Sequence, residues 1–66
     1  MQSVASKLKV FRESCNKSQE KVTDDTGINI GKIELGTTNI SLTTLSILCK
    51  YYGYTLEELF RGIETE

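Results

Sequence analysis

The chain has 66 residues, of which 38% are hydrophobic, with eight basic and nine acidic side chains and a formal net charge of −1. A chain of this length forms a single domain, here residues 1–66, without room for both a core and a deep catalytic cleft. No apolar run approaches the roughly 20 residues that span a bilayer, and residues 1–11 lack the continuous apolar stretch of a signal peptide. We therefore expect a cytoplasmic protein with no membrane partner.

The side-chain inventory argues against a metal site and against catalysis. With no histidine and only two thiols, Cys15 and Cys49, the chain offers no credible zinc site. Both cysteines fall on apolar faces of predicted helices and fit small buried hydrophobes. A disulfide is less favoured, because nothing else indicates an oxidising compartment. Since there is no phosphate-binding glycine loop and no base beside a nucleophile, we expect no enzyme activity, no cofactor and no small-molecule ligand.

Charge is distributed unevenly along the chain. The first half holds most of the basic residues, namely Lys7, Lys9, Arg12, Lys17, Lys21 and Lys32. The last ten residues hold four acids, Glu57, Glu58, Glu64 and Glu66. A net charge near zero is unusual for a domain that binds nucleic acid, since such domains are usually basic. The asymmetry still allows one positive face.

The first two predicted helices follow from their apolar spacing and their caps. An apolar stripe at helical spacing predicts a helix over residues 3–14, consisting of Val4, Leu8, Phe11 and Cys15. Ser3 can cap its start. A second helix begins at Ser18, whose hydroxyl can accept from a backbone N–H two or three residues on. Because Val22 is its single strong apolar residue, this helix needs its neighbours to hold it in place.

Residues 24–27 (Asp-Asp-Thr-Gly) predict a turn, since Asp and Thr compete for local backbone donors and Gly27 permits a sharp bend. A third helix over residues 27–34 should follow, capped by Asp25 or Thr26. Within it, Asn29 and Lys32 lie three residues apart on a polar, exposed face. Gly31 lowers helix propensity by about 1 kcal/mol relative to alanine, which suggests the close approach of another backbone, from the second helix or from DNA.

The second half of the chain predicts two more helices. Gly36 can end the third helix in a left-handed conformation, and a polar loop, residues 37–39, follows it. Ser41 caps a fourth helix that Gly53 closes, and the Thr55–Glu58 pair fits a capping box for a fifth. Because no segment alternates with period two, we predict an all-α fold, a compact bundle of five short helices.

The short helix, turn and short helix within residues 18–39 resemble a DNA-reading unit, so their polar side chains are candidate contacts to double-stranded DNA. Asn29 could pair with adenine, and Lys32 could reach guanine or a phosphate. Ile28 fits either the core or a contact to a thymine methyl group. Each candidate also fits an ordinary solvated surface. The candidate DNA-binding residues are Lys17, Gln19, Lys21, Thr26, Ile28, Asn29, Lys32, Thr37, Thr38 and Asn39.

Over roughly residues 5–60 the chain resembles the lambdoid repressor and Cro family of helix-turn-helix regulators, also called the XRE family. The resemblance rests on an ordered set of motifs: Ser18-Gln19, then IxxIExG from Ile30 to Gly36, then SLxTL from Ser41, then LxELF from Leu56. It implies five helices with the second and third as the DNA-reading unit. It also implies that Gln19 contacts phosphate, that Thr38 and Asn39 grip the DNA backbone, and that Arg12 forms an ion pair with Glu34.

Two departures from the family bear on recognition. The interval from Ser18 to Glu34 is about three residues shorter than in typical members, which affects the turn or the start of the third helix. Leu35 replaces a residue that is often basic in this family. With the small residues Gly27 and Gly31 in the reading unit, much of the recognition is expected to come from phosphates and DNA shape.

We therefore expect a sequence-specific transcriptional regulator, a repressor, acting as a homodimer on a two-fold symmetric operator. The end of the fourth helix and the fifth helix carry more apolar side chains than so small a core needs, which indicates a dimer interface. Its candidate residues are Tyr51, Tyr54, Leu56, Phe60 and Ile63. The alternative is a protein-interaction module, such as an antitoxin-like partner, with weak or no affinity for DNA. The acidic balance and the two glycines of the reading unit favour that alternative somewhat.

Overall fold

The computed structural model describes residues 3–37 and 39–61, and within these ranges it contains five helices and no strand. The helices are α1 (Val4–Ser14), α2 (Gln19–Thr26), α3 (Ile30–Glu34), α4 (Leu42–Tyr52) and α5 (Leu56–Phe60). The predicted all-α bundle is confirmed. In the same part of the chain, no helix is long and apolar enough to cross a membrane, and no three side chains of metal-ligating type are grouped.

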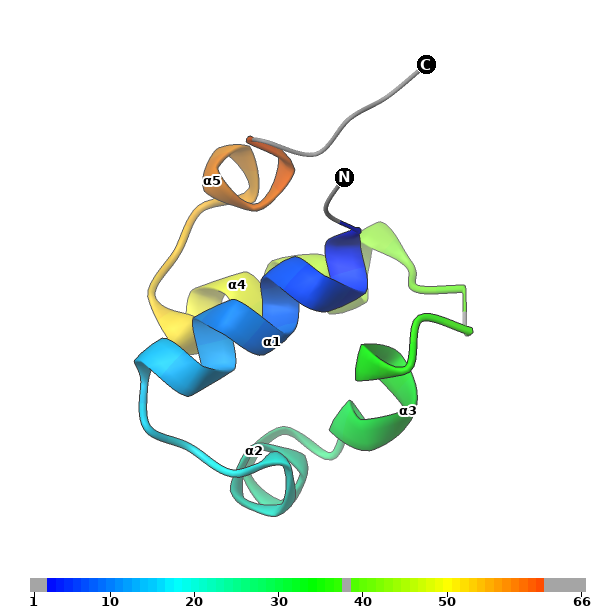
Figure 1. The fold of residues 1–66 in the computed structure, drawn as a ribbon, viewed down its shortest axis with the longest axis vertical. Coiled ribbons are helices and arrows are strands. Elements are labelled where there is room, and N and C mark those ends of the chain that lie inside the picture. Colours follow the sequence, from blue (N-terminus) through cyan, green and yellow to red (C-terminus); the bar gives the residue numbers. More distant parts are fainter. Residues whose placement is uncertain (1–2, 38, 62–66) are drawn as a thin grey trace.

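Helices α1 and α4 form the centre of the domain (Figure 1). Helix α1 contacts α3, α4 and α5, whereas α2 contacts α3. Figure 1 shows α5 near one end of the longest axis and α2 at the other. The side chains between these helices form one core, whose buried members are Leu8, Phe11, Val22, Ile30, Ile33, Leu45, Leu48, Cys49, Tyr52 and Leu59.

Four helices start at the caps that the sequence predicts. The hydroxyls of Ser3, Ser18 and Ser41 each accept from the backbone N–H three residues on, at 3.0–3.1 Å. Thr55 does the same from Glu58, whose carboxylate accepts from the Thr55 N–H, so the predicted capping box is present. These bonds satisfy backbone donors that have no partner inside a helix. The starts of α1, α2, α4 and α5 are thus determined locally.

The turn between α2 and α3 lies later than predicted. Helix α2 continues through Thr26 and ends at Gly27, whose φ of +74° is left-handed, so the predicted turn at residues 24–26 is wrong. The Thr26 hydroxyl donates to Val22 O at 2.7 Å and accepts from Ile28 N at 3.2 Å, which keeps the last turn of α2 helical. The turn therefore consists of residues 27–29.

Helix α3 begins at Ile30 rather than at residue 27, and neither Asp25 nor Thr26 caps it. The cap is Asn29, whose side chain accepts from Lys32 N. The Thr23 hydroxyl accepts from Ile30 N at 3.2 Å, so α2 satisfies a second backbone donor of α3. As a result α3 has only five residues. Gly36, with φ of +79°, follows its end as predicted.

Both cysteines are free thiols, not joined in a disulfide. Cys49 is buried, and burial raises the pKa of its thiol. Cys15 is half-buried and donates to the Tyr52 carbonyl at 3.4 Å. This arrangement matches the expectation of two small core residues.

Candidate nucleic-acid interface

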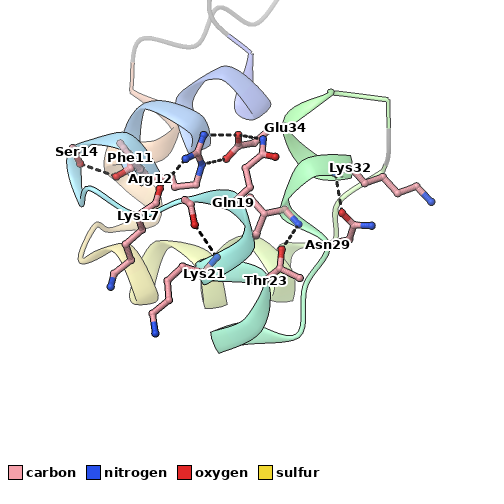
Figure 2. Close-up of polar contacts among 12 residues, drawn as sticks. Phe11, Arg12, Ser14, Lys17, Gln19, Lys21, Thr23, Asn29, Lys32 and Glu34 are labelled. Atoms are coloured by element: carbon pink, nitrogen blue, oxygen red, sulfur yellow. Dashed lines mark hydrogen bonds and ion pairs between the residues drawn. The ribbon is translucent and has the colours of Figure 1, made fainter.

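A buried ion pair joins α1 to the end of α3. Arg12 Nε donates to Glu34 Oε2 at 2.7 Å, and Nη2 donates to Oε1 at 3.1 Å (Figure 2). The two side chains are only 11% and 4% exposed. The hydrogen bond to Glu34 raises the pKa of the Arg12 guanidinium. Because Nη1 also donates to Lys17 O at 2.8 Å, Arg12 fixes the segment that leads into α2 as well.

Gln19 extends this network from the start of α2. Its Nε2 donates to Glu34 Oε1 at 2.9 Å, so a single carboxylate holds α1 and α2 against α3 (Figure 2). Its Oε1 lies 3.3 Å from the position that a Cβ would take at Gly31. The expectation that Gly31 admits the backbone of the second helix is therefore wrong, because the neighbour is the Gln19 side chain; the approach of a DNA backbone stays a prediction. Gln19 is exposed, but one of its two amide hydrogens is already used inside the domain.

Asn29 and Lys32 form the exposed polar part of α3. Asn29 Oδ1 accepts from Lys32 N at 3.1 Å, and Figure 2 shows the amide nitrogen directed away from that bond. This cap was missed by the sequence reading. Its signal was present, since asparagine is a favoured cap and stands directly before the Ile30–Ile33 pair.

A hollow of about 210 Å³ lies beside α3 and brings several candidate residues together. Ile28 lines it and is partly buried against the core, while its contact to a thymine methyl group stays a prediction. Thr37 is exposed in the segment after α3, and Thr38 lies outside the described residues. The hollow is lined by Ile28, Asn29, Lys32, Ile33, Asn39, Ile40 and Thr44.

Of the two candidate lysines in and before α2, Lys21 pairs with an acid and Lys17 lies near an aromatic ring. Lys21 Nζ lies 3.3 Å from Asp25 Oδ1, and the Tyr51 hydroxyl donates to Asp25 Oδ2. This bond from Tyr51 lowers the pKa of Asp25 and raises that of Tyr51 to about 12. Lys17 Nζ lies 5.7 Å from the centroid of the Tyr51 ring. Asp25 thus offsets part of the positive charge that Lys21 contributes to this side of the domain.

Thr26 has an internal role rather than an outward one. Its hydroxyl oxygen is used twice in the turn, as donor to Val22 O and as acceptor from Ile28 N. The side chain is half-buried. Thr26 therefore shapes the turn and leaves little of its polar surface for a partner.

The apolar side chains of the α4–α5 end are largely used within the domain. The Tyr54 ring stacks on Phe11 with centroids 3.8 Å apart, Leu56 packs against the core, and Tyr51 bonds to Asp25. Phe60 is 45% exposed, whereas Ile63 lies outside the described residues. The apolar surface available for a dimer is thus smaller than the sequence indicates, because ring stacking and core packing consume it.

A second hollow, of about 410 Å³, lies between α4 and α5. The exposed side chain of Ile47 lines this hollow, and Lys50 contributes a positive charge to it. Helix α5 supplies one wall through Leu56, one turn before Phe60. The hollow is lined by Thr43, Ser46, Ile47, Cys49, Lys50, Tyr54 and Leu56.

Comparison with known proteins gives one family match. A family model described as helix-turn-helix matches residues 8–59, which span most of the chain. Neither the curated proteins nor the solved structures yield a match. The matched span includes α2, the turn at residues 27–29, α3 and both members of the Arg12–Glu34 pair.

Proposed function

The chain belongs to the lambda repressor-like helix-turn-helix family of DNA-binding regulators, and we propose that it represses transcription by binding a two-fold symmetric operator as a homodimer. The observation that carries this proposal is the placement of α3. Its buried side is fixed by Glu34 to α1 and α2, while Asn29 and Lys32 face outward. In helix-turn-helix complexes the second helix of the unit enters the major groove and the first crosses the backbone.

On this proposal the contacts divide between bases and backbone. Lys32 and Asn29 on α3 face the major groove, and Thr37 and Asn39 after it reach the phosphates. Thr38 remains a prediction for the same loop. Lys17 and Lys21 add phosphate contacts along α2, where the phosphate competes with Asp25. So small a set of reading side chains leaves a substantial part of the recognition to DNA shape.

We place the dimer interface at the α4–α5 end. Phe60 projects from α5 as an exposed aromatic ring, and Glu57 precedes it by one turn. The hollow on the same end carries Lys50. In a two-fold dimer the same patch meets itself, so Phe60 of each copy can cover the hollow of the other while Glu57 faces Lys50. Two copies double the contacts to DNA and set half-sites about one helical turn apart.

A binding assay on the DNA that flanks the gene tests this function. We expect specific retention of a duplex containing an inverted repeat, weakening steeply as salt rises. Phe60→Ser should keep the helical signal, shift the protein toward monomer in sedimentation and weaken operator binding. An absence of retention at low salt would contradict the proposal.

The second candidate is a protein-interaction module with little affinity for DNA. It is favoured by the net charge of −1 and by the pairing of Lys21 with Asp25. The same assay separates the two candidates, because such a module retains no duplex even at low salt.

A further inference from the structure

We propose that the outward side of α3 reads guanine, through the amide nitrogen of Asn29 and the ammonium group of Lys32. This inference rests on the proposed function and names the base that the site recognises. Both side chains are exposed and line the same hollow. In Figure 2 the Asn29 nitrogen and the Lys32 side chain extend to the same side of α3.

The acceptor oxygens of α3 side chains are directed inward. Asn29 Oδ1 accepts from the Lys32 backbone at 3.1 Å. Both oxygens of Glu34 are engaged, Oε2 by Arg12 and Oε1 by Arg12 and Gln19. Gly31 has no side chain to offer. The polar groups that this helix directs outward are therefore hydrogen-bond donors.

A surface of donors matches one base edge better than the others. In the major groove guanine presents two acceptors, N7 and O6, whereas adenine pairs its N7 acceptor with an N6 donor and cytosine presents a donor. Asparagine reads adenine by offering its oxygen and its nitrogen together. The capping bond turns the Asn29 oxygen toward the backbone of α3, so the nitrogen is the end that remains. The adenine contact expected from the sequence is accordingly replaced by guanine.

The test begins with a duplex that the wild-type protein enriches from a random-sequence library. Each guanine of that duplex is then replaced, one at a time, by 7-deazaguanine, which lacks only the N7 acceptor. We expect one guanine per half-site at which the replacement weakens wild-type binding about fivefold or more. Guanines elsewhere in the duplex serve as controls.

Two variants assign the effect to the side chains. Asn29→Ser keeps a capping oxygen and removes the amide donor, so the fold is retained while the 7-deazaguanine effect shrinks. Lys32→Ala should reduce it in the same way. Asn29→Asp keeps the cap and replaces the donor by an acceptor, which should move the preference at that position from guanine toward cytosine. Unfolding midpoints of the three variants report on the fold independently.

The outcomes separate this inference from the function on which it rests. If no duplex is enriched, the proposed function is contradicted and this inference with it. If a duplex is enriched but no 7-deazaguanine weakens binding, the function stands and the guanine assignment is wrong. The assignment is also wrong if the effect persists undiminished in both Asn29→Ser and Lys32→Ala.

Discussion

The two sides of α3 differ sharply in how they are held. On the inner side, Ile30 and Ile33 are buried in the core and Glu34 is bonded to α1 and α2. On the outer side, Asn29 and Lys32 are exposed, and the Asn29 cap is the one side-chain bond described there. Many interactions therefore hold the helix in position, whereas on the proposed function only a few side chains are available to read DNA. Position and readout are separable, so substitutions can abolish one and spare the other.

The inner side is needed because α3 is short. A helix of five residues is far below the length at which helices persist alone. Its geometry must come from tertiary contacts, and a buried ion pair fixes geometry more surely than it adds net stability. Because the inner side holds α3 in place, we expect substitutions at Arg12 and Glu34 to change stability strongly, and substitutions at Asn29 and Lys32 to change it little.

The largest expected effect is on the inner side. Glu34→Ala should lower the free energy of unfolding by about 3–5 kcal/mol, because it leaves the buried Arg12 guanidinium without its partner. Urea unfolding followed by circular dichroism measures this loss. Lys21→Ala is the control, since its pair with Asp25 lies at the surface, and it should lower the free energy of unfolding far less than Glu34→Ala does. An equal loss of unfolding free energy in the two variants would contradict the role of the buried ion pair in holding α3.

A second effect is expected at alkaline pH. Tyr52 of α4 is buried with the core, and among the described residues its hydroxyl has no hydrogen-bond partner. Burial raises its pKa from 10.0 to about 12. The neutral Tyr52 phenol therefore contributes fully to the free energy of unfolding below pH 10. This contribution is lost as the pH rises toward 12, by up to about 2–3 kcal/mol.

Tyr52→Phe should remove much of this alkaline loss while leaving stability at pH 7 unchanged or slightly higher, because it deletes an unpaired buried hydroxyl. Unfolding midpoints at pH 7, 10 and 11 measure both quantities. Tyr51 also has a pKa of about 12, so Tyr51→Phe is compared in parallel. A marked loss of stability at pH 7 in Tyr52→Phe would show that its hydroxyl is bonded after all.

A smaller effect is expected where α2 and α3 meet. Gly31→Ala gains up to about 1 kcal/mol of helix propensity. The new Cβ lies 3.3 Å from Gln19 Oε1, the end of a flexible side chain that can shift. We expect a net gain below about 1 kcal/mol in thermal unfolding. Gly36→Ala is the contrasting control, since its φ of +79° should make alanine cost about 1–2 kcal/mol.

The helix starts that the sequence predicts are those set by local chemistry. Ser3, Ser41 and Thr55 bond to backbone three residues away, so the pattern alone locates α1, α4 and α5. The start of α3 was misplaced because residues 24–26 have turn-like composition, yet the Thr26 hydroxyl keeps them helical. Whether such residues form a turn or the end of a helix depends on side-chain hydrogen bonds of this kind, which residue composition alone does not reveal.

The exposed pair Asn29 and Lys32 was predictable from spacing, whereas the Arg12–Glu34 pair was predictable only through resemblance. Arg12 and Glu34 stand 22 positions apart, and no spacing rule connects two charges at that distance along the chain. The same holds for Tyr51 and Asp25, which bond across 26 positions of the chain. The role of Tyr51 in a dimer interface stays a prediction.

The most direct test of the account measures DNA affinity against salt for the wild type, Lys32→Ala and Lys9→Ala, using duplexes from the DNA that flanks the gene. Lys9 is an exposed lysine of α1 and matches Lys32 in charge. All three proteins should unfold within about 0.5 kcal/mol of one another. We predict that Lys32→Ala binds more weakly at every salt concentration, because a contact to a base in the major groove is lost, while Lys9→Ala matches the wild type. Equal binding by the two variants, or no binding at low salt, would contradict a DNA-reading role for the outer side of α3.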